Sequence, residues 1–410
     1  MRGTLIACGL IGGVMALSLG WGQEPAPTTP EKTTPAKLVL EPPAIKRDLA
    51  KLSLLERQAY LSGQRGTDWL ARSNRADGRF LFGYLPALRT PMEGNHYLTQ
   101  VEAAHALGRA ARFYQNPQGV AIARQALLTL LLDTTLSKDS KVRSTSLPNT
   151  LVNRLAAAGL LVLAIHELPE PGKDLVEQAT QLGNFIGKQQ RADGSLIVTE
   201  GDGQADVAAI NHFTGPALLA LVRLGQIDMV KRARPTYSKW WQEHKNLAMI
   251  PWHTAAYAEA YLKTREQAFA DTVYEMNDWL CALQYQQADP RHPLWLGGFK
   301  NWHDGKEGSE APEASSAVYV ESLAQACRVA RQAGDVHRFG RYREAAQRGL
   351  GFLGTLQYTE ANTQHFADWY RPVLVGAFHV SHEDGNLRLD YTSRAVAALV
   401  QYLEGVAEVH

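Results

Sequence analysis

The stretch SNRADGRF (73–80) recurs, 116 residues further along, as KQQRADGSL (188–196). Each copy ends a long amphipathic stretch and contains Arg-Ala-Asp-Gly, whose glycine can take the left-handed conformation that terminates a helix. A helix ending that recurs over such a distance indicates a repeated helical unit.

Two further helix endings have the same pattern, which gives WLARSN (69–74), FIGKQQ (185–190), WLCALQ (279–284) and FLGTLQ (352–357). Each has an aromatic residue, then leucine or isoleucine, then three residues and an amide side chain. An apolar residue follows each of them, namely Phe80, Leu196, Phe299 and Phe378. Because the last carbonyls of a helix need partners, we expect the amide to bridge the end of one hairpin to the next.

From Leu54 onward, apolar residues recur at three- and four-residue spacing without sustained strand-like alternation, so the predicted fold class is all-α. Glycine, proline and polar clusters divide the chain into twelve helices, or six hairpins. The predicted ranges are 53–73, 97–115, 118–134, 149–168, 172–190, 209–225, 227–244, 252–264, 265–286, 313–333, 336–357 and 388–405.

A two-helix unit cannot bury its own apolar face, so its repetition predicts a stacked or closed array. An open superhelix of tetratricopeptide repeats has a strict period of about 34 residues. The four amides here lie 116, 94 and 73 residues apart. This uneven spacing favours six hairpins closed into an (α/α)6 toroid.

The repeated pattern is similar to the glutamine-tryptophan repeat of squalene and terpenoid cyclases. ADGRF (76–80) and ADGSL (192–196) resemble the Asp-Gly turns of α/α toroid proteins, including six-hairpin glycosidases and uronyl epimerases. As an architecture, the resemblance covers most of residues 53–405. It implies that the amino-terminal ends of the inner, even-numbered helices rim a binding cleft.

The composition limits the kinds of partner that are expected. Lysine plus arginine (42) nearly equals aspartate plus glutamate (41), and no basic stripe appears, so nucleic acid is not an expected partner. Residues 1–22 have an early arginine, an apolar run and small residues, which is typical of a secretory signal. Residues 23–52 are predicted to be a Pro/Thr-rich linker and 53–410 a single toroid domain.

We therefore expect a secreted or periplasmic protein with no membrane segment beyond this amino terminus. A lipoprotein modified at Cys8 and an uncleaved anchor are the alternatives. Cys281 and Cys327 are expected to be small buried residues rather than a disulfide scaffold.

The starts of the even-numbered helices carry more than capping residues. Capping accounts for Asn, Ser, Thr and acidic groups, but the positive end of the helix dipole disfavours histidine and arginine. Aromatic rings that stack on sugars, with amides and acids for hydroxyl groups, suggest a carbohydrate ligand, although a core position is the alternative for each aromatic residue. The predicted substrate-binding residues are His96, Tyr97, Asn153, Asn211, Trp252, His253, Trp302, Tyr319, Arg388 and Tyr391.

Two kinds of chemistry fit a carbohydrate. Hydrolysis needs two carboxyl groups across the scissile bond, and no pair is singled out among the available loop acids, which are Glu93, Asp202, Asp206, Asp304, Glu310, Glu313 and Asp390. A lyase or epimerase acting on a uronate needs a base and a group that neutralises the carboxylate, for which Asn211 and His212, with Tyr257, Arg388 and Arg394, are the right residue types. The predicted catalytic residues are Asp390, His212, Tyr257, Glu313 and Arg394.

NLRLDYTSR (386–394) resembles the Arg-x-Asp-Tyr segment that opens the last inner helix of some bacterial toroid proteins and uronyl epimerases. Asp390 is expected to pair with Arg394, four residues later on the same helix face, or with Arg388 through the cap. A purely structural clasp that closes the ring is the alternative role for this segment.

Several motifs are absent from the sequence. It lacks the Asp-x-Asp-Asp and Asp-Asp-x-x-Asp motifs of terpene enzymes, a phosphate-binding loop, a dinucleotide fingerprint and cysteine-histidine zinc spacing. No cofactor or metal is predicted. The prediction is thus an exported carbohydrate-active enzyme, either a glycoside hydrolase or a lyase or epimerase acting on uronate-containing glycans. Two further hypotheses are a non-catalytic toroid that binds glycan or protein, and a terpenoid-cyclase-like protein without the usual acids.

Overall fold

The computed structural model describes residues 49–199, 206–303 and 305–407, all within one compact unit, Leu40–His410. All twelve predicted helices are present, and most of their ends lie within a few residues of the prediction. They are α1 (Leu54–Ser73), α2 (Tyr97–Phe113), α3 (Pro117–Leu131), α4 (Arg154–Glu167), α5 (Lys173–Lys188), α6 (Val207–Arg223), α7 (Ile227–Glu243), α8 (Ile250–Thr264), α9 (Gln267–Ala282), α10 (Ser316–Ala333), α11 (Val336–Thr355) and α13 (Leu389–Gly405). A short helix, α12 (Arg371–Leu374), and two 3₁₀ turns, η1 (Leu49–Lys51) and η2 (Pro293–Trp295), complete the described helices.

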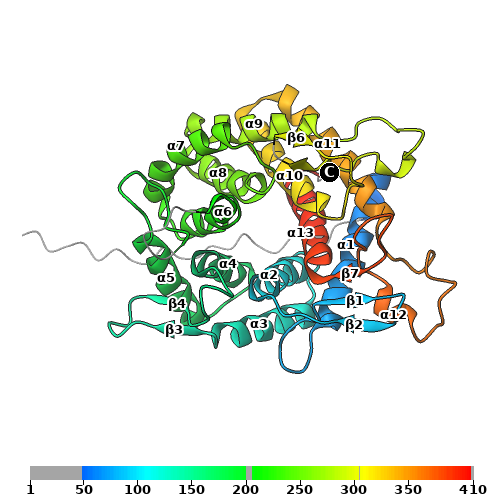
Figure 1. Ribbon diagram of the computed structural model, residues 1–410, viewed down its shortest axis with the longest axis horizontal. Coiled ribbons are helices and arrows are strands. Elements are labelled where there is room, and N and C mark those ends of the chain that lie inside the picture. Colours follow the sequence, from blue (N-terminus) through cyan, green and yellow to red (C-terminus); the bar gives the residue numbers. More distant parts are fainter. Residues whose placement is uncertain (1–48, 200–205, 304, 408–410) are drawn as a thin grey trace, which may run out of the picture. The chain divides into compact units, whose positions relative to one another are not determined.

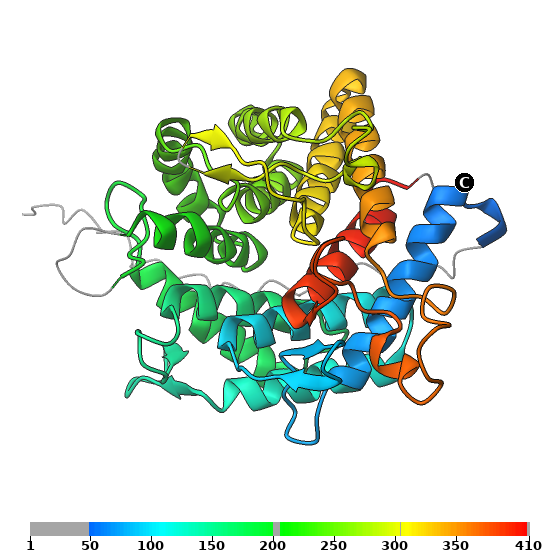
Figure 2. The ribbon, with the colours of Figure 1, turned by 45° about the vertical axis from the view of Figure 1, so that its right-hand side comes forward.

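The inner helices α2, α4, α6, α8, α10 and α13 form a closed ring (Figure 1). Each packs against the next, and α13 packs against α2. In Figures 1 and 2 the last helix, α13 in red, lies beside α10 in yellow and α1 in blue, so the two ends of the repeat meet. The predicted all-α toroid is confirmed.

Burial distinguishes the inner helices from the outer ones. In α4 nearly every residue is buried, as expected for a helix that is apolar all round. In the outer helix α7 the buried residues are Val230, Ala233, Tyr237 and Trp241, which recur at three- and four-residue spacing and form one stripe. The sequence pattern therefore decides which helix of each hairpin lines the ring.

Two glycines allow inner helices to approach closely. A Cβ at Gly159 of α4 would lie 2.8 Å from the backbone of Pro216, and a Cβ at Gly215 of α6 would lie 2.5 Å from the Cβ of Trp252. The neighbouring backbone leaves no room for a larger residue at Gly159. The second contact fixes the first turn of α8, which carries Trp252.

The repeated helix endings form the same structure four times. In each, the amide residue pairs with the apolar residue after the turn: Asn74 with Phe80, Gln190 with Leu196, Gln284 with Phe299 and Gln357 with Phe378. Each glutamine amide also donates to a carbonyl of the next outer helix, at Met229, Ala345 and Ser62 respectively, over 2.8–2.9 Å. The prediction that the amide bridges neighbouring hairpins is confirmed for the three glutamines, whereas the amide of Asn74 donates to Gly78 within its own turn.

The glycine of each turn has a positive φ, with values of 79° at Gly78, 84° at Gly194, 87° at Gly297 and 100° at Gly376. The turns also press against the next outer helix. A Cβ at Gly297 would lie 2.1 Å from the carbonyl oxygen of Arg348, and the same holds for Gly194 and the carbonyl oxygen of Arg232. Both the backbone conformation and the contact require glycine.

Gln284→Ala is expected to lower the free energy of unfolding by about 2–3 kcal/mol, because its buried amide donates to the carbonyls of Gly297 and Ala345 and both would lose this donor. Asn74→Ala is the matched control. Its shorter amide donates to Gly78 within its own turn, so a loss of about 1 kcal/mol is expected. Urea unfolding of both variants measures the difference, and equal losses would contradict the bridging role.

Three small sheets, which were not predicted from the sequence, decorate the ring. β1 (Gly83–Leu85) pairs antiparallel with β2 (Thr90–Met92) and with β7 (Leu387–Arg388), β3 (Thr134–Leu136) pairs with β4 (Arg143–Thr145), and β5 (Trp302–His303) pairs with β6 (Lys306–Glu307). Strands of two or three residues are too short to show alternation. The first sheet matters for the site, because the pairing of Gly83 with Arg388 places the start of α13 beside the segment that leads into α2.

The predicted signal (1–22) and residues 23–48 of the predicted linker lie outside the described residues. The end of that linker is part of the domain, because Leu49–Lys51 form η1 and Leu52 is buried. Cys281 and Cys327 are buried and unpaired, as expected. Among the described helices, none has the length and apolar character needed to cross a bilayer.

Candidate functional site

Helix α2 carries a polar stripe that faces the centre of the ring. Glu102, His105 and Arg109 recur at spacings of three and four residues, so they share one face. Their partners come from several other inner helices. Glu102 pairs with Arg394 of α13, the Nε2 of His105 lies 3.6 Å from Glu167 of α4, and Arg109 bonds Glu404 of α13 over 2.6 Å.

Charged groups of α2 and of the start of α13, together with one tryptophan of α8, form what we call the axial cluster: Glu102, Trp252, Arg388, Asp390 and Arg394. Arg388 donates to both carboxylate oxygens of Asp390, over 3.0 and 2.7 Å. Arg394 pairs with Glu102 and lies over the ring of Trp252, 4.9 Å from its centroid. Arg394 thus connects α13 both to α2, through Glu102, and to α8, which lies across the ring from α2, through Trp252.

The two carboxyl groups of the axial cluster remain accessible. The side chain of Glu102 is 18% exposed and that of Asp390 is 23% exposed. Burial raises the pKa of Glu102 above its ordinary value, the nearby Asp390 raises it further, and Arg394 opposes the shift. A carboxyl group with a raised pKa, next to a second carboxylate, is a candidate for acid–base chemistry.

The axial cluster continues toward α10. The hydroxyl of Tyr391 donates to Glu313 over 2.6 Å, and the guanidinium of Arg388 lies 4.9 Å from the centroid of the Tyr391 ring. Burial and the hydrogen bond to Glu313 raise the pKa of Tyr391. His96, exposed at the start of α2, lies close enough to lower the pKa of Glu102.

Below the axial cluster, a floor network of buried ion pairs closes the centre of the ring near the carboxyl-terminal ends of the inner helices. Glu167 is its hub, bonded over 2.7 Å by both Arg112 and Arg223. Arg223 also bonds Glu259 over 2.8 Å. Both carboxylates of the floor network, Glu167 and Glu259, have arginine partners, so the floor network is a structural part of the ring.

The predicted pair between Asp390 and Arg394 is wrong. The partner of Asp390 is Arg388, which was the second expectation, and the partner of Arg394 is Glu102. Arg394 therefore links α13 to α2 rather than forming an ion pair within its own helix.

Three predicted site residues lie in the core, so their assignment to an accessible site is wrong. Tyr97 is buried and donates to the carbonyl of Leu130 over 2.8 Å. His253 and Tyr257 are fully buried; the Nδ1 of His253 lies 3.3 Å from the Tyr257 hydroxyl and its Nε2 lies 2.9 Å from Thr214. Burial lowers the pKa of His253 to about 3, so it is neutral in the folded protein.

Two predicted amides have structural partners. Asn153 caps α4 by accepting from the N–H of Ala156, and it donates to Val198 over 2.7 Å. Asn211 accepts from the indole N–H of Trp240 over 2.9 Å. Both amide side chains therefore stabilise the fold.

The remaining predicted residues lie outside the axial cluster. Tyr319 packs edge-on against Phe299, with centroids 5.2 Å apart, and Trp302 packs in the same way against Trp279. His212 is exposed on α6 and lies beside Phe213. The structure therefore does not place His212, Asn211 and Tyr257 around one accessible point.

Glu102 and His105 were not predicted from the sequence. They lie in the second and third turns of α2, whereas most of the predicted residues were taken from the segments at which the inner helices begin. A detectable signal was present: three ionisable residues recur on one face of an otherwise alanine-rich helix, in EAAHALGR (102–109). Charged side chains on an inner helix are unfavourable in the core unless they are paired, so such a stripe is expected to face the ring centre.

No protein family matches the sequence, and neither does any curated protein. Among solved structures, the chain is similar to the unsaturated glucuronyl hydrolase from Bacillus sp. GL1, with a TM-score of 0.58 and 12% identity over 86% of this chain and 98% of that chain. An unsaturated glucuronyl hydrolase specific for heparin has a TM-score of 0.56 and 14% identity over 85% of this chain and 98% of that one.

The GH76A α-1,6-mannanase from Salegentibacter sp. HEL1_6 is similar to the same degree, with a TM-score of 0.57 and 11% identity over 84% of this chain and 98% of that one. All these proteins are α/α toroids, and the present chain has that fold. At these identities the likeness establishes the fold alone.

Proposed function

We propose that this protein is an exported glycoside hydrolase in which Glu102 is the general acid and Asp390 is the second carboxylate. One observation carries the proposal: Asp390 lies close enough to Glu102 in the axial cluster to contribute to the raised pKa of Glu102. Toroids that act on saccharides, as the names of the similar structures say, make the same chemistry reasonable here. Export rests on the signal-like residues 1–22.

The proposed mechanism follows from the positions of the two acids. Hydrolysis needs one carboxylic acid to protonate the departing oxygen and one carboxylate to act as base or nucleophile. Burial favours the protonated form of Glu102, which suits the acid. Arg388 holds both oxygens of Asp390 and so fixes its orientation for the second role.

The groups around the two acids suggest the substrate class. Trp252 and Tyr391 provide aromatic surface for a sugar ring. Arg388 and Arg394 place two guanidinium groups beside it, and guanidinium binds carboxylates in a planar, two-bond geometry. We therefore propose a glycan that contains a uronate. Glu313 and His96 border this region and are proposed to contact hydroxyl groups.

A lyase or epimerase acting at a uronate is the second candidate, and the pair formed by Tyr391 and Glu313 favours it. A tyrosine that donates to a carboxylate, next to Arg388, has the groups needed to remove a proton beside a neutralised substrate carboxylate. In this version Tyr391 takes the role predicted for Tyr257, which is buried in the core.

A terpenoid-cyclase-like protein and a non-catalytic binding module fit the axial cluster less well. The first predicts an apolar cavity, whereas the axial cluster contains four charged side chains. The second predicts no convergent acid pair, whereas Glu102 and Asp390 are close enough to influence each other.

The test is proton NMR of the full chain incubated in heavy water with neutral and uronate polysaccharides. New reducing-end signals are expected, because hydrolysis creates them. Olefinic signals would instead indicate a lyase, and loss of the C5 proton signal an epimerase. Silence across the panel, from protein with a cooperative melting transition, would favour the binding module and reject an enzyme.

A further inference from the structure

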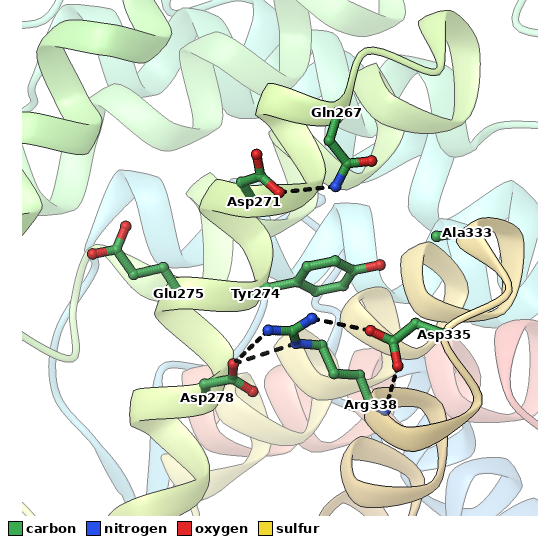
Figure 3. Close-up of a pocket in the computed structure, with 8 residues that line it drawn as sticks. All are labelled: Gln267, Asp271, Tyr274, Glu275, Asp278, Ala333, Asp335 and Arg338. Atoms are coloured by element: carbon green, nitrogen blue, oxygen red, sulfur yellow. Dashed lines mark hydrogen bonds and ion pairs between the residues drawn. The ribbon is translucent and has the colours of Figure 1, made fainter.

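A groove of about 410 Å³ lies in the outer layer, between α9 and the start of α11 (Figure 3). It is distinct from the axial cluster, which belongs to the inner ring. Its lining is mainly acidic: Asp271, Glu275 and Asp278 come from α9, and Asp335 caps α11. Arg338 is the one cation among the residues that line the groove.

Two of these carboxylates are balanced by arginine. Arg338 bonds Asp335 over 3.0 Å and Asp278 over 3.4 Å, and Arg341 bonds Asp278 over 3.1 Å. Figure 3 shows Arg338 between the two carboxylates. This half of the groove is therefore close to neutral.

The remaining two carboxylates have neutral partners. Asp271 accepts from the amide of Gln267 over 2.8 Å, and Glu275 accepts from the amide of Gln242 over 3.1 Å. Asp271 and Glu275 are four residues apart on α9, so they lie on one face of that helix. Their charges give the groove an excess of negative charge.

Tyr274 supplies a second and independent observation. It lines the groove and is only 6% exposed, and its hydroxyl is buried without a hydrogen-bond partner among the described residues. The guanidinium of Arg338 lies 4.4 Å from the centroid of its ring. In Figure 3 the ring extends across the groove, with the hydroxyl directed toward Ala333 and Asp335. A buried hydroxyl without a partner is unfavourable, so a ligand that bonds it would be stabilised.

We propose that this groove binds the ammonium group of a small organic amine. An ammonium group is a charged donor, which matches the carboxylate of Asp271 and the free hydroxyl oxygen of Tyr274; Glu275 points away from that hydroxyl in Figure 3 and contributes negative charge at the edge of the groove. A metal ion fits less well, because the described residues contain no group of three His, Cys, Asp or Glu side chains placed to hold one. The inference does not depend on the proposed glycosidase activity.

Isothermal titration calorimetry of the full chain, at low salt, tests the charge requirement with three probes. Glucosamine carries an ammonium group, N-acetylglucosamine has the same sugar ring without the charge, and putrescine is an amine without a ring. We expect glucosamine or putrescine to bind and N-acetylglucosamine not to bind. Binding of glucosamine alone identifies an amino-sugar site, and binding of putrescine alone identifies a site for unbranched amines. No binding by either amine, or equal binding by N-acetylglucosamine, overturns the proposal.

Variants locate the binding. The double change Asp271→Asn with Glu275→Gln is expected to weaken amine binding by about tenfold or more, because it removes the charge-assisted hydrogen bond to Asp271 and the negative charge of Glu275 at the edge of the groove. The double change Asp228→Asn with Asp368→Asn removes the same charge at carboxylates that are 88% and 91% exposed on other segments, and it should leave binding unchanged. Equal weakening in the two double variants would mean that net charge alone is responsible and would overturn the site.

Tyr274→Phe provides a readout that a structural role would not give. The change removes a hydroxyl without a partner, so the Tm of the free protein should not fall, while amine binding should weaken by about three- to tenfold. A variant that binds the amine as tightly as the original protein would remove Tyr274 from the site. A lower Tm with unchanged binding would assign the hydroxyl to folding instead.

Discussion

Glu102→Gln is expected to lower kcat on a natural saccharide by about a thousandfold, within the range that a general acid contributes. An amide cannot act as the acid that protonates the departing oxygen, but its oxygen can still accept a hydrogen bond from Arg394. The fold should therefore persist. Initial rates on the substrate identified by NMR, together with a thermal melt, measure the effect.

Two controls make the interpretation specific. An aryl glycoside with an acidic phenol as leaving group needs little protonation, so Glu102→Gln should act on it far better than on the natural saccharide. Glu93→Gln changes an exposed carboxylate in the loop before α2 and should leave kcat within about twofold. Equal losses on both substrates would exclude Glu102 as the acid.

Glu167→Ala is expected to lower the free energy of unfolding by about 3–5 kcal/mol. The side chain is 3% exposed and bonds both Arg112 and Arg223, so its removal leaves two guanidinium groups short of a partner in the floor network. Glu360→Ala removes the partner of Arg65 at a site that is 65% exposed, and its cost should stay below about 1 kcal/mol. Urea unfolding of both variants provides the comparison.

The pH dependence gives a second readout of the same prediction. Although burial opposes ionisation, Arg223, the hydrogen bond from His105 and Arg112 hold the pKa of Glu167 well below its ordinary value of 4.5. The unfolded chain therefore binds a proton more readily than the folded one. The stabilisation is complete above pH 4.5 and is lost as the pH falls below it. Glu167→Gln should have a flatter stability profile on acidification, and an unchanged profile would contradict the floor network as its source.

The fold was predictable from the sequence because its repeated signal is local. An amide, a glycine and an apolar residue recur at four helix endings, and these form the same turn wherever they occur. Helix α4 shows where this reasoning is weaker. It begins at Arg154 rather than residue 149, because the cap is Asn153 and not an earlier polar residue of the same loop. The short strands depend on pairing between distant segments, which local pattern does not reveal.

The site was predictable only in part. The position of a residue along a helix indicates how far along the ring axis it lies, but not whether its side chain faces the ring centre or the core. Trp252 and His253 are consecutive in the first turn of α8, and each residue turns the helix by about 100°. Trp252 consequently reaches Arg394 near the ring centre, whereas His253 is buried in the core against Thr214. Arg388, Asp390 and Arg394 were predicted because a distinctive motif marked them.

The most direct test of the central claim is a crystal structure of the Glu102→Gln variant soaked with the saccharide on which the unmodified protein acts. The variant should bind the saccharide without turning it over. We predict that the sugar lies at the ring centre, with its glycosidic oxygen within hydrogen-bond distance of residue 102 and its anomeric carbon facing Asp390. A sugar bound elsewhere on the protein, with the axial cluster unchanged, would contradict the assignment of Glu102 and Asp390 as the catalytic pair.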